Sequence, residues 1–172
     1  MAQYISRVGL ALDGNTGESL IPAKQAWMQD EAWQGLRKLC ETSLIEQDYF
    51  KLFLLQNLVI DSFMSELVYT QFDQWLAQHQ ARDLAMLMEF MQEAMADLRK
   101  WSDSVFKTAA AESAHNKQLL SQWLAEYLPE VKAAFSAWAA EALSADAVDI
   151  AEQKLLERSK KIGIELEQIL QA

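Results

Sequence analysis

The chain contains very few residues that interrupt a helix. Its 172 residues include only five glycines and two prolines, the two residue types that most strongly disfavour the interior of a helix. Between these interruptions, apolar residues recur every three or four positions, which is the spacing of one face of an α-helix. The sequence therefore predicts an all-α protein with long helices.

The most apolar segment, residues 47–77, is predicted to be a helix at the centre of a helical bundle. In its first half, apolar side chains occur at nearly every position, as expected for a helix that is covered on all sides. Asp61 interrupts this apolar run, and a buried carboxylate requires a partner. We therefore expect a cationic side chain close to Asp61.

One domain is expected for residues 1–172. A chain of this length with 51% hydrophobic residues can bury one sizeable core, and no linker-like stretch divides it. Short helices are predicted within residues 1–46, one of them capped by Asp30. A C-terminal helix, interrupted by Gly163, is predicted within residues 147–172.

Two more long helices are predicted between these ends. Asp83 can cap a helix whose apolar stripe extends to Val105, and a second stripe begins at Leu119. Whether the chain breaks between residues 109 and 116 is left open. Pro129 is expected to kink or divide the second helix, because proline removes a backbone hydrogen bond and its ring clashes with the preceding turn.

The charge of the chain argues against several kinds of partner. With 25 acidic and 15 basic residues, the formal net charge is -10, so nucleic acid and anionic membrane surfaces would repel it. No signal peptide or membrane span is recognised. Cys40 is the only cysteine, which leaves no internal disulfide and no thiolate metal cluster. We expect a cytoplasmic protein whose partners are other proteins.

Candidate metal ligands are few. His79 and His115 are the only histidines, which excludes a di-iron site built from two Glu-x-x-His pairs within this chain. Glu112 and His115 match that spacing once and would share a helical face. The alternative is a polar helix end with a solvated or capping histidine. Cys40 is expected on an apolar helix face, and no activated nucleophile is recognised.

Several segments of the two predicted core helices carry a recognisable pattern: LFLLQN, LVIDS, LVYTQFDQWL, DLAMLMEF and RKWSDSVFKTAAAES. Together with YISRVGLALD near the N-terminus, they resemble the C-terminal half of the β subunit of bacterial multicomponent monooxygenases, with the phenol hydroxylase branch nearest. The resemblance implies a ferritin-like helical bundle that is partial, lacking the N-terminal helices of the full subunit. The helices at residues 49–76 and 84–105 would then leave a wide apolar face to be covered.

The same resemblance implies that this chain has no catalytic, cofactor-binding or metal-binding residues. In this family the α subunit binds a di-iron centre and the β subunit is its non-catalytic relative. Asp61 falls at the position of a ligand glutamate, and Asp97 to Lys100 falls over a Glu-Leu-Arg-His ligand motif, so a lysine replaces the histidine. A protonated lysine has no lone pair for a metal. Asp61 or Asp97 is expected to neutralise Arg99 or Lys100 inside the bundle; the alternative is a solvated Asp97–Lys100 pair.

The function implied by the resemblance is structural support of a phenol hydroxylase. Its partners would be α and γ subunits and a second β copy, with a regulatory protein and a reductase acting indirectly. The complex would insert one oxygen atom of O2 into an aromatic ring, using di-iron in α and NADH, FAD and a 2Fe-2S cluster in the reductase. The alternatives are a self-sufficient bundle that binds metal or a small ligand through Glu112 and His115, and a generic adaptor bundle.

Overall fold

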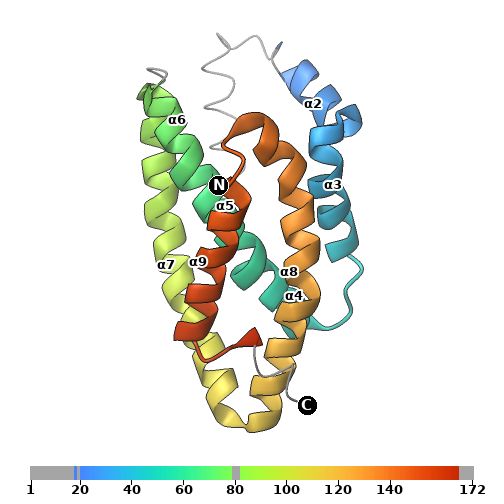
Figure 1. Cartoon of the computed structure of the whole chain (residues 1–172), viewed down its shortest axis with the longest axis vertical. Coiled ribbons are helices and arrows are strands. Elements are labelled where there is room, and N and C mark those ends of the chain that lie inside the picture. The colour runs from blue at the N-terminus through green and yellow to red at the C-terminus, as the bar shows by residue number, and fades with distance from the viewer. Residues whose placement is uncertain (1–17, 19, 79–81, 167–172) are drawn as a thin grey trace.

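All regular structure in the described part of the chain is helical (Figure 1). The structure is a computed structural model that describes residue 18 and residues 20–78 and 82–166, with the backbone alone for 82–87. Six helical stretches follow one another within these residues: α2, Leu20–Gln29; α3, Glu31–Ser43; one continuous helix, Tyr49–Gln78; α7, Arg82–Glu112; α8, Ala114–Ala142; and α9, Ala147–Lys161. The prediction of an all-α protein is confirmed. His79, and the parts of the predicted terminal segments at 1–17 and 167–172, lie outside the described residues.

The helix Tyr49–Gln78 contains two π-helical segments. Its successive parts are α4, Tyr49–Leu54; η1, Leu55–Ile60; α5, Asp61–Glu66; η2, Leu67–Phe72; and α6, Asp73–Gln78. In η2 the Thr70 hydroxyl donates to the carbonyl of Ser65, five residues earlier, at 3.0 Å. A π turn rotates the following residues relative to an unbroken α-helix, and such turns are frequent at functional sites. The short α5 between them carries Asp61 and Ser62.

This helix is long and apolar enough, by length and composition, to cross a membrane, contrary to the expectation that no segment comes close to a membrane span. Many of its apolar side chains are nevertheless buried in the bundle, among them Phe53, Leu54, Leu58, Val59, Phe63 and Leu67. In Figure 1 it runs diagonally behind α8 and α9, and both helices contact it. The prediction of a central, covered helix is confirmed, and core packing accounts for its composition.

Most helix ends follow the local sequence signals. The Asp30 side chain accepts a hydrogen bond from the Ala32 amide at the start of α3. Ser113, in extended conformation, separates α7 from α8, and its hydroxyl accepts from the Asn116 amide. Gly163 lies just beyond α9 with φ of 86°, a conformation that only glycine adopts without strain. The predicted interruption at Gly163 is confirmed, and the break left open between residues 109 and 116 lies at Ser113.

Of the two outcomes expected at Pro129, a kink or a division of the helix, the division does not occur. α8 continues through Pro129 from Ala114 to Ala142. The flanking Leu128 and Val131 are buried in the core, at 6% and 0% exposure. Because tertiary packing supplies most of the stability of a helix within a protein, these contacts hold α8 together across the missing hydrogen bond.

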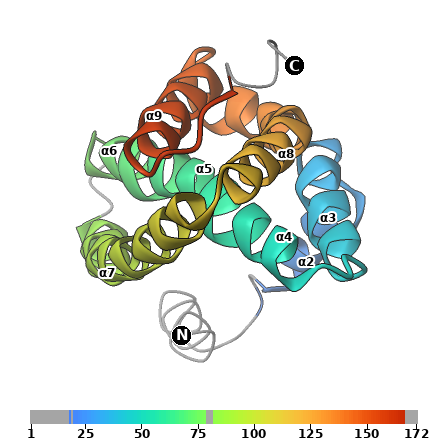
Figure 2. The ribbon, with the colours of Figure 1, turned by 90° about the horizontal axis from the view of Figure 1, so that it is seen from below.

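α3 and α8 approach each other closely at Gly35. A Cβ atom at this position would lie 2.9 Å from both the Cα and the carbonyl oxygen of Ala134. Nearby, the indole rings of Trp33 and Trp138 lie 6.0 Å apart between the same two helices. Figure 2 shows α3 alongside α8 at one side of the bundle. Glycine is therefore required at position 35 for close backbone approach.

Part of the apolar face expected on the two core helices is exposed. Several large apolar side chains of the helix Tyr49–Gln78 and of α7 are reached by solvent in this chain: Tyr49, Trp75, Phe90, Leu98 and Trp101. Met91 and Phe106 of α7 are 5% and 0% exposed and contribute to the core. α7 therefore supplies apolar side chains both to the interior of the bundle and to its surface.

Candidate functional site

A buried arginine lies between three helices. Arg158 of α9 is 8% exposed, and its Nε and Nη2 both lie 2.8 Å from Oδ1 of Asp103 on α7. Its Nη1 donates to the hydroxyl of Ser62 on α5 at 2.9 Å and to the Leu58 carbonyl at 3.5 Å. Its Nη2 also donates to the hydroxyl of Ser102 at 3.0 Å. The guanidinium thus joins the central helix, α7 and α9.

Asp61 and Arg99 extend this group of charges. Burial raises the pKa of the Asp61 carboxyl, and the positive charges of Arg158 and Arg99 oppose that rise. Burial lowers the pKa of the Arg158 guanidinium, whereas the charge of Asp103 and its hydrogen bond raise it; an arginine stays protonated in either case. We call Asp61, Arg99, Asp103 and Arg158 the polar cluster. Its two carboxylates and two guanidinium groups nearly balance in charge.

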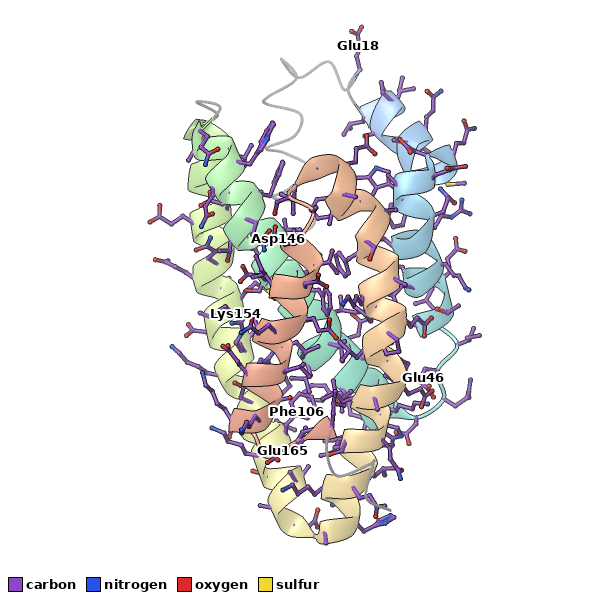
Figure 3. The ribbon with its side chains drawn as sticks, viewed as in Figure 1. Glu18, Glu46, Phe106, Asp146, Lys154 and Glu165 are labelled. Atoms are coloured by element: carbon purple, nitrogen blue, oxygen red, sulfur yellow. The ribbon has the colours of Figure 1, made fainter. Side chains whose placement is uncertain are left out.

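A cavity of about 350 Å³ opens beside the polar cluster. Arg99, Asp103 and Arg158 form part of its wall, together with Lys154 and Lys161 of α9. Figure 3 shows Lys154 beside α9 on the side of α7, and the buried Phe106 nearer the α7–α8 turn. The cavity is therefore a polar recess on the α9 side of the molecule.

Asp97 and Lys100 lie outside this cluster. Lys100 Nζ is 3.0 Å from Asp97 Oδ1, and the two side chains are 78% and 82% exposed. The expectation that either residue neutralises a partner inside the bundle is wrong, because α7 turns both positions toward solvent while Arg99 faces inward. The alternative interpretation, a solvated pair three residues apart, describes what the structure contains.

Arg158 was not predicted as a site residue, although a signal was present. Ala151, Leu155 and Ile162 are buried on α9 or at its end, and Arg158 falls among them at the spacing of three and four residues that marks one helical face. A charged residue on an apolar stripe indicates a buried ion pair. The mixed charge of residues 147–172 obscured this pattern.

Glu112 and His115 do not share a helical face. Glu112 ends α7 and His115 lies in the first turn of α8, with Ser113 extended between them. Both side chains are exposed, and Glu112 Oε2 accepts a hydrogen bond from Asn116 Nδ2 at 3.0 Å. The prediction that Glu112 and His115 share a helical face is therefore wrong. Cys40, expected on an apolar face, is also exposed.

The polar cluster does not fit a di-iron centre. Centres of this kind use four carboxylates and two histidines, whereas the cluster offers Asp61 and Asp103 next to two guanidinium groups. Two nitrogen atoms of Arg158, Nε and Nη2, already contact Asp103 Oδ1. In residues 18, 20–78 and 82–166, no three His, Cys, Asp or Glu side chains gather in a way that could hold a metal ion.

Known proteins share both the sequence and the fold. The chain is 70% identical over 165 residues to the phenol 2-monooxygenase oxygenase component MhpL of Acinetobacter pittii (strain PHEA-2), covering 96% of this chain and 50% of that protein. It is 42% identical to the corresponding component DmpL of Pseudomonas sp. (strain CF600), covering 95% and 50%. The chain thus spans about half the length of the curated relatives it matches.

A solved structure gives the same result. A chain of xenon-pressurized phenol hydroxylase from Pseudomonas sp. OX1 superimposes with a TM-score of 0.89 at 38% identity, covering 95% of this chain and 50% of that one. The bundle accordingly has the ferritin-like helical fold. The family model described as methane/phenol/alkene hydroxylase matches residues 1–113. On sequence and structure alike, the chain belongs to the methane/phenol/alkene hydroxylase family.

Proposed function

We propose that this chain is a non-catalytic, structural β-type component of a di-iron phenol hydroxylase, corresponding to the C-terminal half of that subunit. The relatives named as oxygenase components of phenol 2-monooxygenase support the complex. In such a complex the chain would support the catalytic α subunit and make no bond itself. Similar helical bundles can either hold a metal centre or hold the subunit that contains one, and this chain would have the second role.

One observation supports the non-catalytic role: the buried side chain of Arg158 places a positive charge near Asp61 in the interior of the bundle. The Arg158 guanidinium is 8% exposed and bonded to Asp103, Ser62 and Ser102. An iron ion placed beside it would meet a like charge with little water to screen it. Asp103 is instead paired with Arg158, and Asp61 lies near the positive charges of Arg158 and Arg99.

The proposed complex contains α and γ subunits and a second β copy, with a regulatory protein and a reductase joining during turnover. Its di-iron centre lies in the α subunit, and NADH, FAD and a 2Fe-2S cluster in the reductase supply electrons. It acts in the cytoplasm on an aromatic ring. In this proposal, no residue of this chain binds the di-iron centre, NADH, FAD or the 2Fe-2S cluster.

Co-expression with the α subunit tests the structural role. We expect the two chains to remain in one particle through affinity capture on either subunit and subsequent size-exclusion chromatography. The same capture with an unrelated acidic helical protein in place of this chain is the control. Independent migration of the two subunits would overturn the proposal.

Metal analysis tests the non-catalytic role separately. The chain, expressed alone with iron and purified, is expected to contain far less than one iron per polypeptide, and His115→Ala is expected to leave that value unchanged. Two irons per chain would contradict the proposal. Iron that is lost in His115→Ala would favour the self-sufficient bundle.

A further inference from the structure

The polar recess on the α9 side reverses the charge balance of the molecule. In the whole chain, acidic residues outnumber basic ones by 25 to 15. Among the described residues in the wall of the recess, four are basic and three are acidic. The basic residues are Arg99, Lys154, Arg158 and Lys161, and the space between the walls is about 350 Å³. The recess therefore has room for a small molecule and an excess of positive charge.

The buried end of the recess is formed by Arg158 and Asp103, which neutralise each other. Nε and Nη2 of Arg158 both contact Asp103 Oδ1, Nη2 also donates to Ser102, and Nη1 donates to Ser62. Each nitrogen atom of this guanidinium thus has a partner within the protein. Arg158 fixes the position of α9 against α7, and its hydrogen-bonding groups are not available to a ligand.

Arg99, in contrast, has hydrogen-bond donors to spare. It is half-buried, lines the recess and lies one turn before Asp103, which is bonded to Arg158 instead. Its charge influences Asp61 and Arg158, but no described residue accepts a hydrogen bond from its guanidinium or forms an ion pair with it. A guanidinium has five N–H donors, and two of them in parallel match the oxygens of a carboxylate or phosphate. Arg99 is therefore the part of the wall that can hold an anion.

Lys154 of α9 lies at the same level of the bundle as Arg99. α7 and α9 run in the same direction (Figure 1), and the contact between Asp103 and Arg158 fixes their register. Arg99 and Lys154 each come four residues, about one turn, before the paired residue on their own helix. Lys154 Nζ is 3.8 Å from Glu157 Oε2, and these side chains are 58% and 48% exposed, so this ion pair is weak. Lys154 can therefore supply a second positive charge across the recess from Arg99.

We infer that the polar recess binds the oxyanion group of a small molecule, a phosphate or a carboxylate, between Arg99 and Lys154. The planar guanidinium donates two parallel N–H bonds to two oxygens of this group, and the ammonium of Lys154 donates to it from α9. The bound group joins α7 to α9 one turn away from the buried pair of Asp103 and Arg158. The inference concerns this chain alone and does not rest on the proposed function.

Glu66 of α5 limits the charge that the recess accepts. It forms part of the wall, and its Oε1 accepts a hydrogen bond from Gln71 Nε2 at 3.2 Å. An oxyanion in the recess is attracted by Arg99 and Lys154 and repelled by Glu66. A polyanion would in addition meet the net charge of the chain, -10. The recess therefore suits a single oxyanion group, and removal of the Glu66 charge should strengthen its binding.

Titration calorimetry of the full chain at low ionic strength, with inorganic phosphate and separately with acetate, tests the site. We expect at least one of these anions to bind, and the tighter one identifies the oxyanion group. Arg99→Gln and Lys154→Gln are each expected to weaken binding about tenfold, because each removes a charge-assisted hydrogen bond. Lys100→Gln and Lys160→Gln remove the same charge at exposed positions of the same two helices. These control variants are expected to bind within about twofold of the native chain.

Glu66→Gln supplies a test of the opposite sign. It is expected to tighten binding about threefold, because it removes a repulsion, whereas Glu93→Gln at an exposed position of α7 is expected to have no such effect. Circular dichroism checks that each variant is folded, and Lys154→Gln, at an exposed position, keeps the test available if Arg99→Gln unfolds the chain.

Two results would overturn the inference. One is that neither anion binds to the native chain, including the case in which Arg99→Gln abolishes assembly with the α subunit, because Arg99 then contacts a partner protein. The other is that an anion binds with the same affinity to Arg99→Gln and Lys154→Gln as to the control variants Lys100→Gln and Lys160→Gln, because it then binds outside the recess.

Discussion

Arg158 places a positive charge inside the bundle, and its neighbours determine whether that charge stabilises the fold. Asp103, Ser62 and Ser102 satisfy its donors. A buried ion pair is often no more stable than an apolar pair of similar size, but removing one partner leaves the other charge uncompensated. The two kinds of substitution should therefore have very different effects.

Arg158→Met is expected to lower the free energy of unfolding by about 3–5 kcal/mol, because Asp103 and Asp61 lose their buried cation. Arg158→Met combined with Asp103→Leu is expected to recover most of that loss. Urea denaturation measures both, with Lys154→Met on the exposed face of α9 as the control. Equal midpoints for the single and double variants would show that the ion pair is not responsible.

Asp61 gives the fold a pH dependence whose sign follows from its environment. Burial raises the pKa of this carboxyl above its ordinary value of 3.8. At pH values between 3.8 and the raised pKa, the folded state therefore binds more protons than the unfolded state. The free energy of unfolding therefore falls as the pH rises through that interval. Arg158 and Arg99 reduce the effect without reversing it.

Asp61→Asn is expected to remove this decline. The variant should gain stability relative to the native chain as the pH is raised from 3.8 through the raised pKa. Urea denaturation at a series of pH values measures the difference, with Asp97→Asn at an exposed position as the control. A difference that stays constant or shrinks with rising pH would contradict the assignment.

At the scale of elements, the contact between α3 and α8 depends on the absence of one side chain. Alanine at position 35 would favour the helix by about 1 kcal/mol, but its Cβ would lie 2.9 Å from the backbone of Ala134. Backbone cannot move aside as a flexible side chain can, and overpacking costs about 1–3 kcal/mol. The steric cost is therefore the larger of the two.

Gly35→Ala is expected to lower the melting temperature by several degrees. Calorimetry of the native chain and the variant measures it, and Lys38→Ala, at an exposed position on the same helix, is the control. If Gly35→Ala is the more stable protein, then α3 and α8 do not touch at this point in solution.

For the molecule as a whole, the exposed apolar residues of α4 and α7 set the behaviour of the isolated chain. Tyr49, Leu98 and Trp101 are accessible here, so an apolar dye such as anilinonaphthalene sulfonate is expected to bind and fluoresce. Assembly with the α subunit or another hydroxylase component should reduce that fluorescence and raise the melting temperature. The Trp101→Ala chain, titrated with the same dye, should show a smaller initial signal; an unchanged signal would place the dye elsewhere.

The helices, the covered central segment and the family could be predicted from the sequence, because each leaves a local or linear signal. Scarce glycine and proline, apolar spacing, and a capping residue such as Asp30 act within a few positions. The π segments around Asp61 left no such signal. Pro129 gave a local signal for a break that tertiary packing overrides, because Leu128 and Val131 are held in the core.

Of the two cations that act on Asp61, Arg99 was among the candidates on the next long helix, but Arg158 could not be assigned from the sequence. Lys100 is nearer in sequence, but the rotation of α7 carries it to solvent, and Arg158 comes from α9, more than fifty residues after Asp103. Which charge reaches the interior depends on how α9 docks against α5 and α7. Such docking follows from the summed packing of many side chains, which linear spacing does not contain.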